Sequence, residues 1–237
     1  MKYEESPYAE RFWTQYYDEF VPPEIDLKPF FLADMMKNAV KQYPDVIAYD
    51  FMGTTATYRE LERNVIKFAN FLVAQGLKKR DCVAIHLPNS PQYVIALFGT
   101  FYAGCTSTGM SMLLKPPEIV YQLKDSGAKA LLTLDSFYEE NVREALSTGK
   151  TDVEIVITTN IADMMKLNRI VKWIGKLLYK IPSRDVDPVA GITYIEFMEV
   201  LDAYSGEHAP DVEIDPEKDL AFLQYTGGTT GPPKGAM

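Results

Sequence analysis

The chain has 237 residues, of which 47% are hydrophobic and 12% aromatic, which is enough apolar content for one large globular domain or two small ones. Its net charge of −9 at pH 7 excludes the strongly basic surface on which nucleic-acid binding depends. The N-terminus is acidic and no apolar run approaches the length of a membrane span, so the sequence predicts a cytoplasmic globular protein.

Residues 1–29 are rich in aromatic residues and proline and show weak periodicity. They predict an aromatic N-terminal arm in front of one domain over residues 30–237. Two arrangements stay open for this arm. It packs irregularly on the surface of its own domain, or it is exchanged with a second copy, which leaves a homodimer as a candidate assembly.

Local signals predict the elements that follow. Apolar spacing from Phe31 to Tyr43 predicts a helix, and residues 46–57 predict a short hairpin around Gly53. Thr57 and Glu60 have the spacing of a capping box that opens the next helix. Further predicted elements are strands over 81–87, 105–108, 130–134 and 154–159, and helices over 91–102, 117–126 and up to 146, with caps at Asn89-Ser90 and at Ser136.

The alternation of strands with helices of about ten to fifteen residues decides the fold class. Such spacing predicts right-handed crossovers and an α/β fold, with a mostly parallel sheet and helices on both faces. Toward the end of the chain, Thr193 and Glu196 predict a second capping box and a helix to about residue 203. Residues 219–225 predict a last strand.

The cysteines and histidines give little support for chemistry of their own. Cys82 and Cys105 have apolar neighbours, which favours buried structural thiols over a disulfide or a nucleophile. His86 lies in or beside a buried strand and His208 in an acidic loop, without metal-ligand spacing. We therefore predict no metal ligands and no catalytic residue from these side chains.

A basic amphipathic segment spans residues 166–181. On a helical wheel its apolar residues fall on one side and its five cations on the other, with Trp173 at the border. This pattern is typical of an element that lies on a membrane surface. An ordinary surface helix that covers the domain is the alternative.

The last thirteen residues, 225–237, contain the densest functional signal. Glycines allow successive N–H groups to turn toward one point, threonine hydroxyls add donors, and lysine supplies charge, so the stretch predicts a phosphate-binding loop. Pro233 before the lysine and Gly235 after it do not fit the common G-x-x-x-x-G-K-[ST] pattern. A disordered glycine–threonine tail is the alternative. The candidate phosphate-binding residues are Thr226, Gly227, Gly228, Thr229, Thr230, Gly231 and Lys234.

The sequence Tyr225-Thr226-Gly227-Gly228-Thr229-Thr230-Gly231-Pro232-Pro233-Lys234-Gly235 resembles the phosphate-binding signature of the adenylate-forming superfamily. That superfamily contains acyl-CoA synthetases, luciferases and the adenylation domains of peptide synthetases, and the double glycine is similar to the version in long-chain fatty acyl-CoA synthetases. The blocks at 57–61, 86–92 and 102–105 look like those that begin the large domain of acyl-CoA synthetases. The resemblance covers roughly residues 30–237, as a truncated N-terminal AMP-binding domain that ends at the loop.

The resemblance implies an ATP-dependent long-chain fatty acid–CoA ligase, with ATP, Mg²⁺ and CoA as cofactors and co-substrates. The loop would grip the β- and γ-phosphates of ATP while a fatty acid carboxylate attacks the α-phosphorus. The superfamily's Mg²⁺-binding glutamate, ribose-binding aspartate and catalytic lysine lie downstream of this motif, so we expect no activity from these 237 residues alone. Another acyl- or aryl-acid CoA ligase, or a non-catalytic nucleotide- or lipid-binding fragment, stays open.

Overall fold

The computed structural model describes residues 10–25, 30–166, 183–226 and 232–237. It divides into two compact units, Met1–Phe30 and Phe31–Met237, which are described separately. The first unit contains a short 3₁₀ helix, η2 (Phe12–Tyr16). The rings of Phe12 and Trp13 meet edge to face, with their centroids 5.6 Å apart. Its exposed apolar side chains include Tyr16, Phe20 and Ile25. Exchange of this arm with a second copy stays a prediction, which the molar mass in solution tests.

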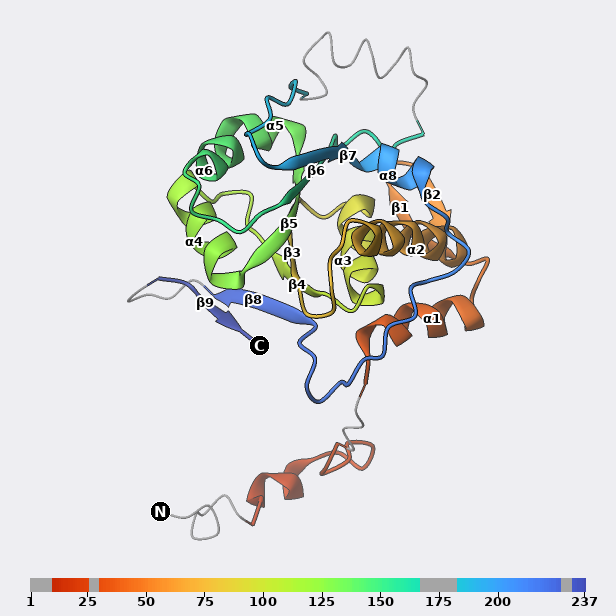
Figure 1. The fold of residues 1–237 in the computed structure, drawn as a ribbon. Coiled ribbons are helices and arrows are strands. Elements are labelled where there is room, and N and C mark those ends of the chain that lie inside the picture. Colours follow the sequence, from red (N-terminus) through yellow and green to blue (C-terminus); the bar gives the residue numbers. More distant parts are fainter. Residues whose placement is uncertain (1–9, 26–29, 167–182, 227–231) are drawn as a thin grey trace. The chain divides into compact units, whose positions relative to one another are not determined.

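A seven-stranded sheet forms the centre of the described second unit (Figure 1). All neighbouring strands are parallel except the last pair, which is antiparallel. This arrangement confirms the predicted α/β fold with a mostly parallel sheet. In spatial order the strands are β7 (Thr193–Glu196), β6 (Ile155–Thr159), β5 (Ala128–Leu134), β3 (Cys82–His86), β4 (Thr106–Gly109), β8 (Phe222–Thr226) and β9 (Lys234–Ala236).

Helices cover both faces of this sheet, as Figure 1 shows. One face packs against α1 (Leu32–Gln42), α2 (Tyr58–Ala74), α3 (Pro91–Tyr102) and α8 (Phe197–Ala203). The other packs against α4 (Pro116–Ser126), a π-helical segment η3 (Tyr138–Val142) and α6 (Arg143–Ser147). The buried side chains between the sheet and α1, α2, α3 and α8 form the first core cluster, and those between the sheet and α4, η3 and α6 form the second. Along β3, Val83 and Ile85 belong to the first core cluster, and Cys82 and Ala84 belong to the second. This alternation is what a strand buried on both faces requires.

Local sequence signals set the elements at the start of this unit. The hairpin β1 (Ile47–Phe51) and β2 (Thr54–Thr57) turns through Met52 and Gly53, both at positive φ. Thr57 and Glu60 form the predicted capping box, in which the Thr57 N–H donates to the Glu60 carboxylate at 2.8 Å. The Ser90 hydroxyl accepts from the Tyr93 N–H and caps α3. Both predicted caps are therefore confirmed.

Two predicted caps are wrong. Ser136 caps no helix, because α5 (Asp135–Phe137) begins one residue earlier and the Asp135 carboxylate accepts the Ser136 N–H at 2.7 Å. Thr193 and Glu196 form no capping box either, since residues 193–196 are β7, which pairs in parallel with β6. The predicted helix is present as α8, which ends at Ala203, and Glu196 is its N-cap residue without a side-chain capping bond. Thr-Tyr-Ile is a favourable strand sequence, and pairing with β6 overrides the local helix signal.

The basic segment predicted over 166–181 lies outside the described residues, apart from its first member. The Lys166 N–H donates to the Thr54 hydroxyl at 2.8 Å. Among the helices within the described ranges, none combines the length and the hydropathy needed to cross a bilayer.

Candidate functional site

The predicted phosphate-binding loop connects β8 to β9. Thr226 and Lys234 lie opposite each other where this antiparallel pair ends, and the Thr226 hydroxyl lies 3.5 Å from the Lys234 carbonyl oxygen. Both side chains belong to exposed residues. The other candidate residues, Gly227, Gly228, Thr229, Thr230 and Gly231, lie outside the described residues. The structure thus places the two ends of the predicted loop.

Hydroxyl groups of β4 fix the position of the strand that leads into the loop. β4 pairs in parallel with β8, and its buried Thr106 and Thr108 hydroxyls donate to the carbonyls of Leu220 and Leu223 at 2.8 and 3.0 Å. These side-chain bonds add to the backbone ladder and specify its register. β8 therefore delivers Thr226 to the carboxyl edge of the parallel strands, where open α/β sheets bind ligands.

A buried carboxylate fixes the chain just before β8. The Asp219 side chain, 5% exposed, accepts from Lys79 at 2.6 Å and from Arg80 at 2.7 Å. It also accepts the backbone N–H of Asp215 at 2.8 Å. The Lys79 hydrogen bond, followed by those from Asp215 and Arg80, holds the pKa of the Asp219 carboxyl well below its usual range. Asp219 therefore stays charged and ties the loop strand to the start of β3.

Helix α4 contacts both ends of the loop. The Tyr225 hydroxyl donates to the Asp125 carboxylate at 2.6 Å, and the Tyr121 hydroxyl donates to the Pro233 carbonyl at 2.8 Å. Burial, followed by the hydrogen bond to Asp125 and its charge, raises the pKa of Tyr225, which therefore remains a protonated donor. Sequence reasoning missed these contacts, because they join residues at least 100 positions apart.

A buried histidine, His86, lies at the end of β3, where the strand order reverses between β4 and β5. The chain runs from β3 to β4 on one side and then crosses back to β5 on the other, which is where open α/β sheets commonly have a crevice. His86, fully buried at the end of β3, contacts the Thr133 hydroxyl and the Ser111 carbonyl, each at 3.1 Å. Because a carbonyl only accepts, Nε2 carries the proton and Nδ1 accepts from Thr133. Burial lowers the pKa of His86 to about 4, so the ring is neutral at pH 7.

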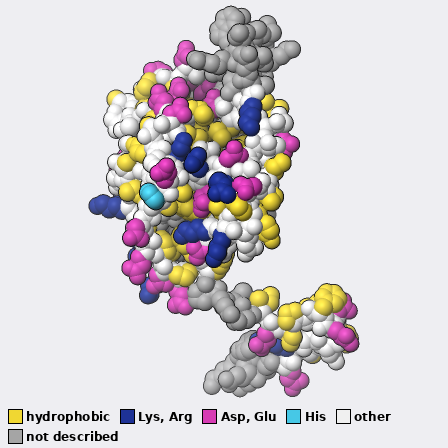
Figure 2. All heavy atoms as spheres, turned by 90° about the vertical axis from the view of Figure 1, so that its right-hand side faces the viewer, with side chains coloured by type: hydrophobic (Ala, Val, Ile, Leu, Met, Phe, Trp, Pro, Cys, Tyr) yellow, Lys and Arg dark blue, Asp and Glu magenta, His cyan; other side chains and the backbone are white. Residues whose placement is uncertain are grey.

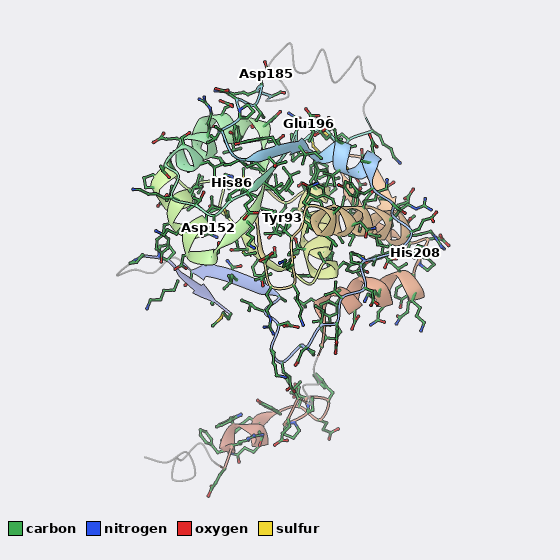
Figure 3. The ribbon with its side chains drawn as sticks, in the orientation of Figure 1. His86, Tyr93, Asp152, Asp185, Glu196 and His208 are labelled. Carbon is green, nitrogen blue, oxygen red and sulfur yellow. The ribbon has the colours of Figure 1, made fainter. Side chains whose placement is uncertain are left out.

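The two histidines do not form a common site. Figure 3 shows His86 inside the second unit and His208 at its outer edge. His208 is exposed, and its backbone carbonyl accepts from the Asn70 amide at 2.9 Å. The prediction of a core histidine and an exposed loop histidine is confirmed.

Both cysteines are buried free thiols, as predicted. Burial raises the pKa of Cys82 to about 11 and that of Cys105 to about 12. They belong to core clusters on opposite faces of the sheet, so they cannot form a disulfide with each other. A thiol with a raised pKa is a poor nucleophile, which agrees with a structural role.

A polar hollow lies at the other end of the strand order, beside β6 and β7. It has a volume of about 470 Å³, and Asp185 and Glu196, labelled in Figure 3, line it together with Asp135 and Asp163. Since β7 and β8 lie toward opposite sides of the sheet, this hollow is separate from the phosphate loop.

The described residues offer no donor set for Mg²⁺. Within the described ranges, no three acidic, histidine or cysteine side chains converge as a metal site would require. The carboxylate of Asp125, beside the loop, accepts the Tyr225 hydroxyl.

On the face of the second unit that carries α1 and α2, acidic, basic and apolar side chains are interspersed (Figure 2). Mixed charges of this kind create no extended field of one sign. This face is therefore an ordinary solvated surface.

A family model described as AMP-binding enzyme matches residues 36–237. The chain belongs to this family. Over 234 residues, this AMP-binding enzyme chain is 38% identical to a long-chain-fatty-acid–CoA ligase of Escherichia coli O6:H1, an alignment that covers 95% of the chain and 39% of the ligase. The chain thus spans about two-fifths of the length of that relative.

Solved structures show the same fold. A long-chain-fatty-acid–CoA ligase from Archaeoglobus fulgidus matches with a TM-score of 0.67 and 23% identity, over 93% of this AMP-binding chain and 38% of that protein. The anthranilate CoA ligase AuaEII in complex with anthranoyl-AMP matches with a TM-score of 0.67 and 21% identity, over 89% and 35%. At these identities the likeness establishes the fold alone.

Proposed function

We propose that this chain is the N-terminal portion of an ATP-dependent long-chain fatty acid–CoA ligase. In this proposal, residues 1–29 form an arm and residues 30–237 the first part of the AMP-binding domain. The observation that carries the proposal is the 38% identity to a long-chain ligase over 95% of the chain. The antiparallel stems β8 and β9, which bring Thr226 and Lys234 opposite each other, support it.

The proposed reaction has two steps. A fatty acid carboxylate attacks the α-phosphorus of ATP, so that an acyl-adenylate forms and pyrophosphate leaves. The thiol of CoA then attacks the acyl carbonyl and AMP leaves. The residues of this chain would act on the polyphosphate in the first step. The Lys234 ammonium, the Thr226 hydroxyl and the N–H groups of the glycine-rich segment would hold the β- and γ-phosphates in place as the bond to the α-phosphorus breaks.

Two other functions compete with this one. An aryl-acid ligase is the first, since AuaEII, which shares the fold, is an anthranilate CoA ligase. The 38% identity to a long-chain ligase over 95% of the chain favours the long-chain substrate. A non-catalytic nucleotide- or lipid-binding fragment is the second, and it predicts ATP or lipid binding without pyrophosphate exchange.

ATP–pyrophosphate exchange by the complete protein that contains this chain tests the proposal. We expect exchange to depend on a fatty acid and to be fastest with long acyl chains. Lys234→Ala should slow it about 30-fold, or about 2 kcal/mol, because the variant loses one charge-assisted bond to phosphate. Lys234 is exposed, so the expected loss is smaller than the roughly 3 kcal/mol typical of a fully preorganised donor.

Lys150→Ala is a matched control, since Lys150 is exposed and lies outside the loop. It should leave the exchange rate unchanged. Fastest exchange with an aryl acid would overturn the substrate assignment, and equal rates for Lys234→Ala and Lys150→Ala would overturn the role of the loop lysine.

We also propose that the basic segment over 166–181 makes peripheral contact with anionic membranes and that the protein is otherwise cytoplasmic. Its five cations and its apolar stripe support this. The chain should co-sediment with phosphatidylserine-containing vesicles at low salt and detach as salt rises. The double variant Lys172→Glu/Lys176→Glu should lower the binding constant for these vesicles at least tenfold, since each lysine near an anionic membrane surface contributes about 1 kcal/mol. Equal sedimentation of this variant and of Lys124→Glu/Lys150→Glu would contradict the proposal.

A further inference from the structure

One face of helix α4 holds both ends of the predicted phosphate loop. Tyr121 and Asp125 are four residues apart and therefore lie one above the other on the helix surface. Tyr121 donates to the Pro233 carbonyl, directly before β9, and Asp125 accepts the Tyr225 hydroxyl near the end of β8. We call Tyr121, Asp125 and Tyr225 the α4 clamp. A single rigid element thus contacts the two points between which the glycine-rich segment runs.

Helix α4 is itself firmly anchored to the sheet. Its Ile119 and Leu123 side chains are fully buried in the second core cluster. The Gln122 amide, also buried, donates to the Gly109 carbonyl at the end of β4 at 2.9 Å. Gly127, at positive φ, ends the helix. Tyr121 and Asp125 are therefore held in a fixed position relative to β4, the strand beside β8.

The glycine at position 235 makes room for the clamp. Tyr225 and Gly235 lie opposite each other in the β8–β9 pair, and a Cβ added at Gly235 would lie 3.3 Å from Cζ of the Tyr225 ring. The ring therefore packs directly on the backbone of the partner strand. From this packed position the Tyr225 hydroxyl reaches the Asp125 carboxylate.

The chemistry of the two bonds suits a positioning role. The bond from Tyr225 joins a neutral donor to a carboxylate at 2.6 Å, and such charge-assisted bonds are about twice as strong as neutral ones. Glycine-rich segments lose much conformational entropy when they are ordered. Backbone donors stabilise an anion effectively only when their positions are fixed beforehand.

We propose that the α4 clamp positions the ends of the loop for polyphosphate binding. Tyr121, Asp125 and Tyr225 act through the loop backbone and are positioning residues. The inference rests on the proposed function, because it assumes that the ligand of the loop is the polyphosphate of ATP.

Hydrogen exchange of the 237-residue chain, with and without inorganic pyrophosphate, tests the clamp. Without pyrophosphate, amides in peptides that cover β8 and β9 should exchange about five- to tenfold faster in Tyr225→Phe, and about threefold to fivefold faster in Tyr121→Phe. The pyrophosphate concentration that gives half-maximal protection should rise about fivefold in Tyr225→Phe. Asp125→Asn keeps an acceptor without the charge, so its effect should lie between those of wild type and Asp125→Ala.

Tyr102→Phe is the matched control, because the Tyr102 hydroxyl donates to the Glu62 carboxylate at 2.8 Å in another part of the fold. It should shift the urea midpoint about as much as Tyr225→Phe, yet leave the exchange of β8 and β9 and the response to pyrophosphate unchanged. If Tyr225 affected only the global free energy of unfolding, the two variants would show the same exchange pattern, and the half-maximal pyrophosphate concentration would not change.

The clamp would be overturned if the amides of β8 and β9 exchanged no faster in Tyr225→Phe and Tyr121→Phe than in Tyr102→Phe. A wild-type chain that pyrophosphate never protects would instead overturn the polyphosphate assignment of the loop. In that case the exchange measured without pyrophosphate still decides whether α4 holds the stems.

Discussion

Replacing Phe68 with alanine is expected to destabilise the chain by about 3–5 kcal/mol, the range for deleting a buried aromatic side chain. Phe68 lies on α2 and is fully buried in the first core cluster. Its ring lies 5.9 Å from that of Phe71 and 5.8 Å from that of Phe197. The substitution therefore removes contacts between α2 and α8 as well as the buried area of the ring itself.

The surrounding structure cannot close the resulting cavity. α2 and α3 already touch through Gly99, where an added Cβ would lie 2.8 Å from Cδ1 of Phe68 and 3.0 Å from the Val65 carbonyl oxygen. Because the backbones are this close, the helices cannot move together when the ring is removed. The loss should lie toward the upper end of the range, which is a large part of the roughly 5–15 kcal/mol that stabilises a typical domain.

Urea unfolding followed by circular dichroism measures this loss. Phe20→Ala is the matched control, since Phe20 is 83% exposed in the first unit and its deletion should change stability by less than about 0.5 kcal/mol. A midpoint for Phe68→Ala that falls no further than the midpoint for Phe20→Ala would contradict the described packing of α2.

The sequence predicted the elements whose signals are local. The capping box of Thr57 and Glu60 involves residues three apart in the sequence. The turn at Gly53 depends only on the positive φ that a glycine adopts readily. The same kind of pattern failed at Thr193 and Glu196, because partner strand β6, which lies far away in the sequence, supplies the pairing that makes these residues a strand. A local pattern therefore predicts an element only where no distant partner competes for it.

The candidate site likewise has features that a local sequence signal predicted and contacts between distant residues that no such signal indicated. The glycine-rich motif indicated a phosphate loop after the strand near residue 225. The structure has that strand as β8, which ends at Thr226, and phosphate binding by the loop stays a prediction. No sequence signal indicated β9, the bond between Tyr121 and Pro233, or the pairing of Asp219 with Lys79 and Arg80. These contacts depend on the crossovers that bring α4 and the start of β3 next to β8. A residue type and a spacing contain no information about such a neighbour.

Between pH 6.5 and 4, the chain is expected to lose about 3 kcal/mol of stability through His86. The pKa of its folded form is about 4, whereas an unfolded histidine titrates near 6.5. Above pH 6.5 both states are neutral and the full stability is present. As the pH falls from 6.5 to 4, the unfolded state binds a proton that the folded state does not. Stability therefore falls by about 1.4 kcal/mol per pH unit over about two and a half units.

The carboxylates contribute at lower pH. Hydrogen bonds from Lys79, Asp215 and Arg80 depress the pKa of Asp219 below its ordinary value of 3.8, so the stability that Asp219 contributes is present above that value and is lost as the pH falls further. The two windows meet near pH 4. The loss between pH 6.5 and 4.5 can therefore be assigned mainly to His86.

His86→Gln isolates this contribution, since glutamine keeps a donor for the Ser111 carbonyl and does not titrate. This variant should be less stable than wild type at pH 7, because the amide does not fill the space of the ring edge that meets Phe137. Its stability should nevertheless change little between pH 6.5 and 4.5. His208→Gln removes an exposed histidine and should keep the wild-type slope. If urea midpoints of His86→Gln fall with pH as steeply as those of His208→Gln, another group causes the acid sensitivity. The neutral, buried ring at the reversal of the strand order would then not limit stability in acid.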